Sequence, residues 1–289
     1  MSNVLITGGN GQLGSELREL SGEHPEHRYF FTDREELDIS DAAAVEAFVR
    51  TNGIEVIVNC AAYTAVDKAE SDAEAADRIN HLAAGFLARA ARDHGAKLVH
   101  ISTDYVFDGT GHRPYVESDP TAPASVYGRT KCDGEAAVLR INPAGSIIIR
   151  TSWVYSSYGA NFVKTMLRLG KEREQLGVIF DQVGTPTYAK DLAQAVLDII
   201  PHLGSESVEI YHYSDEGVAS WYDFAREIMS MAGIGCAVDP IETAQYPTPA
   251  RRPHYSLLNK SKIKAAYGIT IPYWKESLKR CLQQLGACE

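Results

Sequence analysis

The most constraining feature of the sequence is a glycine-rich turn that directly follows a short apolar run. The segment VLITGGNGQLGSEL, residues 4–17, places Gly8, Gly11 and Gly14 at intervals of three between a predicted strand and a predicted helix. Glycine permits a sharp turn and lets backbone amides approach a pyrophosphate. The following helix start adds unpaired N–H groups and partial positive charge. The pattern predicts a dinucleotide-binding turn; the alternative is a tight strand–helix turn without a ligand.

The alternation of apolar runs with helical patterns continues along the chain. Most of the runs are continuously apolar, as expected for strands buried on both faces. The clearest helical patterns are 41–51, with Asp41 as N-cap, and 73–95, with Gly95 as C-terminal stop. This alternation predicts an α/β fold with a doubly wound parallel sheet of the Rossmann type. The predicted strands are 3–7, 28–32, 37–39, 55–60, 97–103, 146–152 and 208–213.

The pattern changes after about residue 155, where irregular segments become more frequent. We expect residues 1–155 with 181–213 to form the dinucleotide-binding domain. Residues 156–180 with 214–289 are expected to form a smaller, interleaved C-terminal substrate-binding domain, in which the Pro-rich segment 246–253 is a loop. The helices predicted in this part of the chain are 161–170, the second half of 181–200, 220–232 and 273–285.

Charge and cysteine usage exclude several function classes. The net charge of −10 over 289 residues argues against a general binder of nucleic acid or of anionic membranes, because both need a basic face. No apolar run approaches the roughly 20 residues that span a bilayer, and the first residues lack the features of a cleavable signal. An odd number of cysteines, five, without a C-x-x-C pair predicts a reduced, cytoplasmic setting. The scattered histidines predict no metal site.

A second motif lies in the segment SVYGRTKCDGE, residues 125–135, where Tyr127 precedes Lys131 by four residues on a predicted helix. Side chains at this spacing are neighbours on one helical face, with Cβ atoms roughly 5–6 Å apart. Taken alone, the pair is a weak motif, because an exposed amphipathic pair has the same spacing. Its meaning depends on the rest of the chain.

Taken together, the glycine turn, the segment ISTDYVFDG (101–109) and this tyrosine–lysine pair resemble the extended short-chain dehydrogenase/reductase family. The resemblance covers most of the chain and is weakest after residue 214. Within this family, the sequence most resembles the members that reduce the 4-keto group of dTDP-4-dehydro-β-L-rhamnose to dTDP-L-rhamnose with hydride from NADPH or NADH. The matching segments are TGGNGQLG (7–14), NCAAYTAVDKAE (59–70), STDYVFDG (102–109), VYGRTKCDGE (126–135), RTSWVYS (150–156) and VGTPTYAKDLA (183–193).

The resemblance implies three catalytic residues. Tyr127 would protonate the oxygen of the reduced carbonyl, Lys131 would lower the pKa of that phenol and hold the ribose hydroxyls, and Thr103 would hydrogen-bond the keto oxygen. Thr103 also fits a plain strand-end or capping role. Dehydratases of the same family carry an Asp-Glu pair after this threonine, whereas here Asp104 is followed by Tyr105. Reduction is therefore favoured over water elimination.

For the cofactor, Asp33 lies 19 residues after Gly14, where a carboxylate usually holds the adenosine ribose. Arg34 follows it and suits a 2′-phosphate, so the choice between NADH and NADPH stays open. The two alanines after Asn59 let a dinucleotide lie close to the sheet, and they equally fit a tight turn. The residues expected at the cofactor are Gly8, Asn10, Gly11, Gln12, Leu13, Gly14, Asp33, Arg34, Asp38, Ile39, Ala61, Ala62, Tyr63, Tyr127 and Lys131.

For the substrate, a dTDP-4-keto-6-deoxyhexose, the resemblance implies an aromatic and polar pocket. A guanidinium in the loop 246–253 suits the diphosphate geometrically, and Arg251 or its neighbour Arg252 would provide it unless both are solvated. The residues expected at the substrate are Thr103, Asp104, Tyr105, Trp153, Gln182 and Arg251.

Three alternatives remain open at this point. Some family members bind Mg²⁺ through glutamates at a homodimer contact, and Glu16 matches one such position, but no full set of glutamates is found and no metal is predicted. A reductase or epimerase of another nucleotide sugar would share these motifs. A regulatory homologue that binds a partner enzyme without catalysis is the third alternative.

Overall fold

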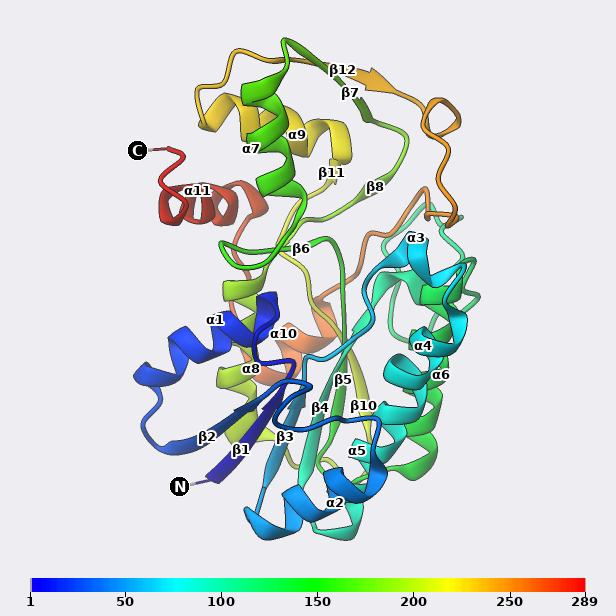
Figure 1. The fold of residues 1–289 in the computed structure, drawn as a ribbon, viewed down its shortest axis with the longest axis vertical. Helices are drawn as coiled ribbons and strands as arrows, with labels where there is room; N and C mark the ends of the chain where they lie inside the picture. The colour runs from blue at the N-terminus through cyan, green and yellow to red at the C-terminus, as the bar shows by residue number, and fades with distance from the viewer. Residues whose placement is uncertain (1, 289) are drawn as a thin grey trace.

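The computed structural model describes residues 2–288 and contains a six-stranded parallel sheet in the order β10-β5-β4-β3-β1-β2 (Figure 1). The α/β doubly wound prediction is confirmed. The order of the strands reverses between β1 and β3, which makes this the switch point at whose carboxyl end ligands bind in such sheets. The strands are β1 (Ser2–Thr7), β2 (His27–Thr32), β3 (Val56–Asn59), β4 (Lys97–Thr103), β5 (Ile147–Thr151) and β10 (Glu209–His212).

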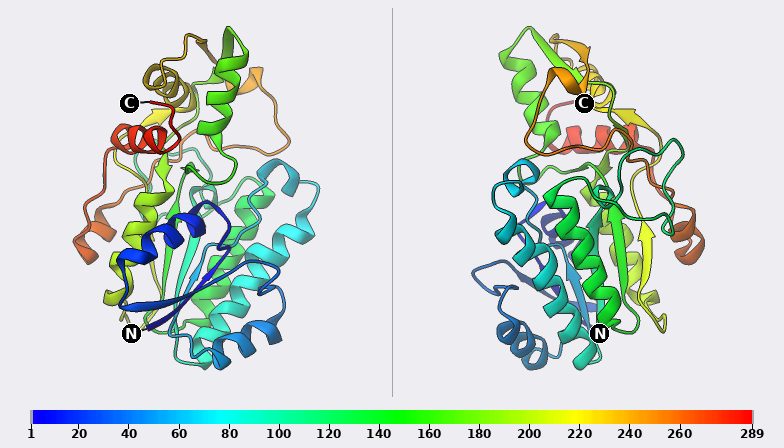
Figure 2. Two further views of the ribbon diagram at one scale, coloured as in Figure 1. Left: turned by 60° about the vertical axis from the view of Figure 1, so that its left-hand side comes forward. Right: turned by 90° about the vertical axis from the view of Figure 1, so that its right-hand side faces the viewer.

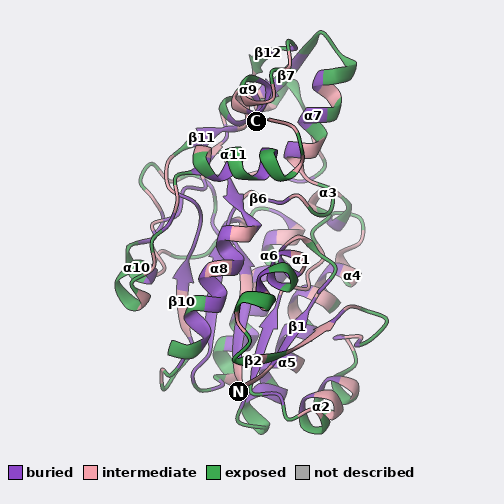
Figure 3. Cartoon of the chain, turned by 90° about the vertical axis from the view of Figure 1, so that its left-hand side faces the viewer, coloured by how far each residue is buried: buried purple, intermediate pink, exposed green. Residues whose placement is uncertain are grey.

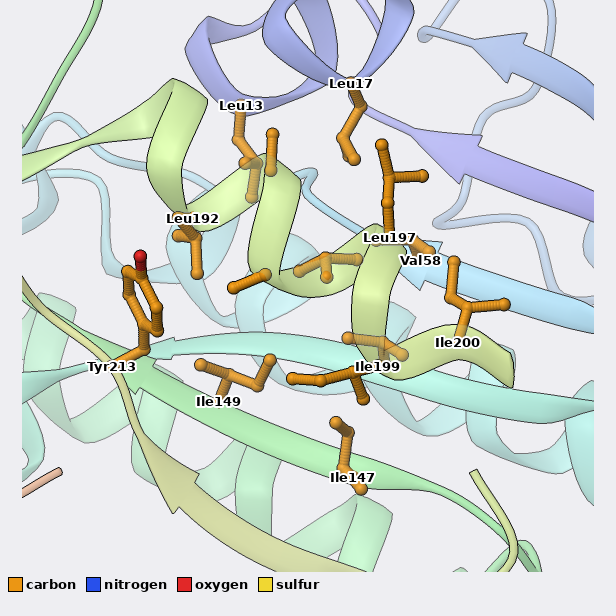
Figure 4. Close-up of a cluster of buried hydrophobic side chains, with 14 of the residues drawn as sticks. Leu13, Leu17, Val58, Ile147, Ile149, Leu192, Leu197, Ile199, Ile200 and Tyr213 are labelled. Carbon is orange, nitrogen blue, oxygen red and sulfur yellow. The ribbon is translucent and has the colours of Figure 1, made fainter. Parts of the chain in front are cut away.

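Helices cover both faces of this sheet (Figures 1 and 2). Helices α1 (Gln12–Leu20), α8 (Ala189–Ile199) and α10 (Ser261–Tyr267) lie on one face; α2 (Ala42–Thr51), α5 (Ala83–Asp93) and α6 (Val126–Ile141) lie on the other. The first face packs apolar side chains of α1 and α8 onto the strands, as Figure 4 shows for Leu13, Leu17, Leu192, Ile147 and Ile149. Figure 3 shows the burial of the strands between these layers.

One predicted strand is wrong. Residues 37–39 form an irregular segment after β2, although Leu37 and Ile39 are buried in the core beneath α2 and α5. The side chain of Asp38 accepts hydrogen bonds from the backbone N–H and the hydroxyl of Ser40, at 2.9 and 2.7 Å. Such a local bond competes with strand pairing. The apolar side chains of 37–39 therefore correctly indicated that the segment is buried, but they did not indicate its backbone conformation.

The predicted helix 73–95 is a continuous helical segment with an irregular middle. It consists of α4 (Ala73–Asp77), a π-helical turn over Arg78–Leu82, and α5, and it ends before Gly95, whose φ is +69°. The π-turn brings the carbonyl of Asn80 against Gly134 of α6, where an added Cβ would lie 2.2 Å from the carbonyl oxygen. Only glycine permits this approach.

A second, smaller part of the chain lies beyond the carboxyl ends of the strands (Figures 1 and 2). Its own apolar cluster joins α7, α9 and α11 to the β7–β12 pair. Two short strands, β8 and β11, pair antiparallel within it, and β6 pairs with β9 beside them. The elements are β6 (Val154–Tyr155), α7 (Phe162–Glu172), β7 (Gln175–Ile179), β8 (Val183–Gly184), β9 (Thr187–Tyr188), β11 (Ala219–Ser220), α9 (Trp221–Met231), β12 (Ala237–Ile241) and α11 (Trp274–Gln284).

We propose that this part is the substrate-binding domain expected from the sequence. The boundaries depart from the expected ones in both directions. Strands β6, β8 and β9 were expected with the sheet but lie in the smaller part, where Tyr155 and Tyr188 join its apolar cluster. Conversely, α10 and the residues after it return to the sheet, where Ile263 and Ile271 join the cluster that covers its α1 side. Their apolar side chains find a partner there because α8 and β10 leave an adjacent face to cover. Within residues 2–288, no helix is both long and apolar enough to cross a membrane.

The contact between Gly134 and Asn80 generates a stability prediction. Gly134→Ala is expected to destabilise the fold by about 1–3 kcal/mol, because the methyl group would clash with a backbone carbonyl that cannot rotate away. Gly85→Ala in α5 is the matched control, since its added Cβ would lie 3.6 Å from Ala137, and the helix gains up to about 1 kcal/mol from alanine. Urea unfolding midpoints measure both. Equal midpoints for the two variants would contradict the close packing of α6.

Candidate active site

A cavity of about 1410 Å³ lies at the carboxyl ends of the strands, where the glycine turn, α6 and the smaller part of the chain meet. Its walls come from the turns after β1, β2, β3, β4 and β5, from the start of α6, and from α7, β7 and the loop 246–252. The volume suits an elongated ligand pair better than one small molecule, because pockets for drug-sized ligands are roughly 300–1,000 Å³.

The glycine turn forms a cradle that only glycine allows. Gly8 has a φ of +66°, and an added Cβ would lie 2.8 Å from the backbone N and Cα of Ala61. An added Cβ on Gly14 would lie 2.3 Å from the carbonyl oxygen of Gly8. Helix α1 begins at Gln12, directly after Gly11, and Gly8, Gly11, Gln12 and Leu13 line the cavity. Backbone amides at a helix start fit the pyrophosphate of NADPH or NADH.

The predicted adenosine end of the cofactor site lies beside β2. One carboxylate oxygen of Asp33 accepts from the backbone N–H of Asn10 at 3.2 Å, and the other accepts from that of Arg34 at 2.8 Å. Asp33, Arg34, Asp38 and Ile39 line the cavity, whereas Asn10 does not. Arg78, on the π-turn, also lines it and was not predicted. Its position follows from the packing of the 73–93 segment, which local sequence does not report.

Helix α6 brings Tyr127 against the end of β4. The hydroxyl of its N-cap, Ser125, accepts from the N–H of Gly128 at 3.1 Å, and an added Cβ on Gly128 would lie 2.3 Å from the carbonyl oxygen of Tyr105. The rings of Tyr127 and Tyr105 meet edge to face, with centroids 5.4 Å apart. One turn later, Lys131 Nζ donates to the carbonyl oxygen of Ile101 at 2.6 Å.

Thr103 ends β4 between these groups. Its hydroxyl donates to a carboxylate oxygen of Asp104 at 2.9 Å and accepts from the N–H of Tyr105 at 3.2 Å. Tyr127, Lys131, Thr103, Asp104 and Tyr105 all line the cavity. The structure therefore brings together the three predicted catalytic residues and two of the predicted substrate residues.

Burial sets the protonation of this group. It raises the pKa of Tyr127 to about 12, Asp104 adds to the rise, and contact with Thr103 opposes it. The expectation of a lowered phenol pKa is wrong, because burial disfavours the phenolate and is the largest influence on this group. Burial lowers the pKa of Lys131 to about 8, against the opposing charge of Glu135. Burial likewise raises the pKa of Asp104 to about 6.

A buried polar layer supports the site from below. Glu135, one turn after Lys131, forms a bidentate ion pair with Arg150 of β5 and accepts from the hydroxyl of Ser102 at 2.5 Å. Both charged side chains are only 3% exposed. Asn80 binds the backbone of Tyr63 and the hydroxyl of Thr130, at 2.8–3.2 Å. Ala61, Ala62 and Tyr63 line the cavity as predicted, while the sequence alone signalled none of these supporting contacts.

On the substrate side, Trp153 and Gln182 line the cavity, and the amide of Gln182 donates to the hydroxyl of Thr243 at 3.0 Å. Arg251 is exposed and lies outside the lining; its neighbour Arg252 lines the wall instead. Adjacent residues in an extended loop point in opposite directions. Arg252 forms a bidentate pair with Asp67, at 2.7 and 3.0 Å, which joins the loop to the short helix α3 (Val66–Ala69) that follows β3.

Glu16 lies outside the cavity lining. It is fully buried at the contact between α1 and the smaller part, where the hydroxyl of Ser156 donates to it at 2.5 Å. Burial raises the pKa of its carboxyl. In the described part of the chain, no three His, Cys, Asp or Glu side chains are grouped so as to hold a metal ion.

Comparisons with known proteins identify the family. Residues 1–287 match the family described as the RmlD substrate binding domain. A dTDP-4-dehydrorhamnose reductase of Aggregatibacter actinomycetemcomitans is 42% identical, over 96% of this chain and 98% of its own length. The crystal structure of a dTDP-4-dehydrorhamnose reductase of Clostridium acetobutylicum has 44% identity and a TM-score of 0.93, over 98% of this chain and 99% of its own. That of Bacillus anthracis, in complex with NADP, has 40% identity and a TM-score of 0.93, over 98% and 100%. The chain therefore belongs to the dTDP-4-dehydrorhamnose reductase family of extended short-chain dehydrogenases/reductases.

Proposed function

We propose that this chain reduces the 4-keto group of dTDP-4-dehydro-β-L-rhamnose to dTDP-L-rhamnose, with hydride from NADPH or NADH. The observation that carries the proposal is the meeting of Tyr127, Thr103 and Lys131 on one wall of a cavity that also contains the glycine turn. Relatives at 42% and 44% identity bear the name of this activity, and a solved relative holds NADP.

The bound nicotinamide cofactor supplies the hydride that reaches C4 of the sugar; the side chains of this protein handle the C4 oxygen. Tyr127 keeps its proton at neutral pH, because its pKa is about 12. An alkoxide binds a proton more strongly than a phenolate, so Tyr127 Oη donates to the C4 oxygen as negative charge develops there. Thr103 carries one hydroxyl proton, which rotation about the Cβ–Oγ1 bond would redirect from Asp104 to the keto oxygen.

Lys131 holds the cofactor end of the site. Its ammonium has three N–H donors, and the Ile101 carbonyl takes one of them at 2.6 Å. The remaining donors suit ribose hydroxyls beside Tyr127. At the adenosine end, Asp33 suits the ribose hydroxyls of NADH, and Arg34 with Arg78 suits the 2′-phosphate of NADPH. This arrangement supports the use of both cofactors.

A dTDP-4-keto-6-deoxyhexose is the small-molecule partner of this proposal, and Arg252, released from Asp67, is the guanidinium that suits its diphosphate. We further propose a cytoplasmic location, supported by five free cysteines. The sequence left the oligomeric state open, with a homodimer as one option.

The function is tested by mixing the purified protein with either reduced cofactor and the dTDP-4-keto sugar. Nicotinamide absorbance is expected to fall, and NMR is expected to identify dTDP-L-rhamnose as the product. Cofactor binding without turnover of this sugar would overturn the proposal in favour of a regulatory homologue. Formation of another epimer would assign the protein to a different nucleotide-sugar reaction.

Tyr127→Phe tests the proton donor. Turnover is expected to fall by roughly 10²–10⁴, because the variant keeps the ring but has no proton to give. The KM for NADPH should change little. Tyr29→Phe is the matched control, since Tyr29 lies on β2 outside the cavity lining. Steady-state kinetics measure both variants, and near-normal turnover in Tyr127→Phe would remove the role of the phenol.

The pH dependence tests Lys131. Its pKa of about 8 lies below the ordinary value, so the ammonium loses its proton as the pH rises through 8, while Tyr127 stays protonated. We expect kcat/KM for NADPH to decline above about pH 8 in the native protein. Lys131→Arg is expected to abolish that decline, because a guanidinium remains charged. A decline of the same midpoint in the variant would mean that another group titrates.

A further inference from the structure

Trp153 has a backbone conformation that few large residues adopt. Its φ is +49°, and within residues 2–288 the only other non-glycine residue with positive φ is Asn142, at the end of α6. Asparagine is common at such helix ends, whereas a tryptophan in the left-handed region is an outlier that persists only where its surroundings hold it. Here the Trp153 carbonyl accepts from the N–H of Thr187 at 3.2 Å, and the hydroxyl of Ser152 donates to the carbonyl of Thr185 at 2.8 Å.

The side chain of Trp153 is held by a second tryptophan. The indoles of Trp153 and Trp221 stack with centroids 3.7 Å apart and planes within 9° of parallel. Phe162 of α7 contacts the Trp221 ring at a centroid distance of 4.7 Å. Aromatic pairs of this kind stabilise beyond their buried area. The two indoles come from different parts of the chain, one from the turn after β5 and one from the start of α9.

Short-range pairing sets the position of Trp221. Strand β11 pairs with β8, with Ala219 opposite Gly184, and Trp221 follows as the first residue of α9. A capping box fixes that helix start: Ser220 Oγ accepts from the N–H of Asp223, and Asp223 accepts from the N–H of Ser220. Trp221 therefore has little freedom to move away from Trp153.

Gly184 provides the space that the stack requires. An added Cβ at this position would lie 3.0 and 3.1 Å from ring carbons of Trp153, and 2.6 Å from the hydroxyl oxygen of Ser256. The strained backbone, the stacked partner and the missing side chain are three separate features that hold one indole in one place. Such over-determination is typical of functional sites.

The place where the indole is held lies beside the proposed reaction centre. Thr151 is the register partner of Thr103, and Trp153 follows two residues later. Both indoles line the cavity. With the C4 oxygen at Thr103 and Tyr127, a sugar ring that extends along β5 would meet this part of the wall.

We infer that Trp221 is a positioning residue, which holds Trp153 so that the two indoles form one apolar wall for the C–H face and the 6-deoxy methyl group of the hexose. The inference rests on the proposed function, because that function places the sugar at Thr103 and Tyr127. It assigns to Trp221 a role in orienting the substrate, with no role in proton transfer.

Circular dichroism measures the stack directly, because two indoles this close give an exciton couplet. The chain has three tryptophans, and Trp274, which is 2% exposed in the core of the smaller part, is the matched control. Trp221→Ala and Trp153→Phe are expected to abolish the couplet, whereas Trp274→Phe is expected to retain it. A couplet retained in Trp221→Ala would overturn the stack.

Kinetics separate a positioning role from a merely structural one. Trp221→Ala is expected to raise the KM for the dTDP-4-keto sugar by roughly tenfold, with a smaller loss of kcat and an unchanged KM for NADPH. Trp221→Phe, which keeps a stacking ring and the fold, should recover most of that loss. Unchanged KM for the sugar in both variants would overturn the inference, even where thermal stability falls.

Two further outcomes keep the inference distinct from the proposed function. Calorimetry first establishes the concentration of dTDP-L-rhamnose that saturates the native protein. At that concentration the exciton couplet in the circular dichroism spectrum is expected to change. An unchanged couplet would overturn the proposed contact between the sugar and the two indoles, but it would leave the proposed function standing. Absence of turnover in the native protein would overturn the proposed function.

The backbone conformation of Trp153 is tested by thermal unfolding. Trp153→Gly is expected to melt at a higher temperature than Trp153→Ala, because glycine adopts positive φ freely. The reverse order would contradict a strained backbone at this position.

Discussion

Helix α6 lies against the end of β4 and against the π-turn more closely than ordinary side chains would allow, and the catalytic geometry depends on this contact. Gly128 touches the carbonyl of Tyr105, and Gly134 touches that of Asn80. Between these two glycines, Lys131 donates to Ile101 at 2.6 Å. The phenol and the ammonium reach the cavity because glycines bring the helix axis within backbone contact of the strand end and of the π-turn.

The same contact explains the electrostatics of the site. A helix seated this tightly excludes water, so burial dominates the pKa of both Tyr127 and Lys131 and moves the two values in opposite directions, to about 12 and about 8. The buried Glu135–Arg150 pair lies one turn further along α6. An isolated charge at this depth would be strongly disfavoured, and the pairing, together with the hydroxyl of Ser102, satisfies the carboxylate. As a result, Tyr127 remains protonated, and the buried Glu135–Arg150 pair supports the helix that carries it.

The opposite wall of the cavity comes from a different part of the chain. Tyr127 and Thr103 stand on the rigid sheet and its helix, whereas Trp221 and Arg252 come from the smaller part of the chain. Contacts between distant residues join the two walls: the Trp153–Trp221 stack at one point and the Asp67–Arg252 pair at another. Sheet-borne groups would set the chemistry, and the groups of the smaller part would select the ligand that reaches it.

The sequence by itself determined the sheet, the glycine turn and the pairing of Tyr127 with Lys131, because periodicity, turn chemistry and helical spacing act between residues that are close in the chain. It did not determine that 37–39 would form a loop or that Arg252 would face the cavity in place of Arg251. It also did not show the buried support of Glu135 by Arg150 or the stack on Trp153. Those outcomes depend on desolvation and on contacts between segments far apart in the chain, and only the folded packing of the two parts decides which side chains meet and which lose their water.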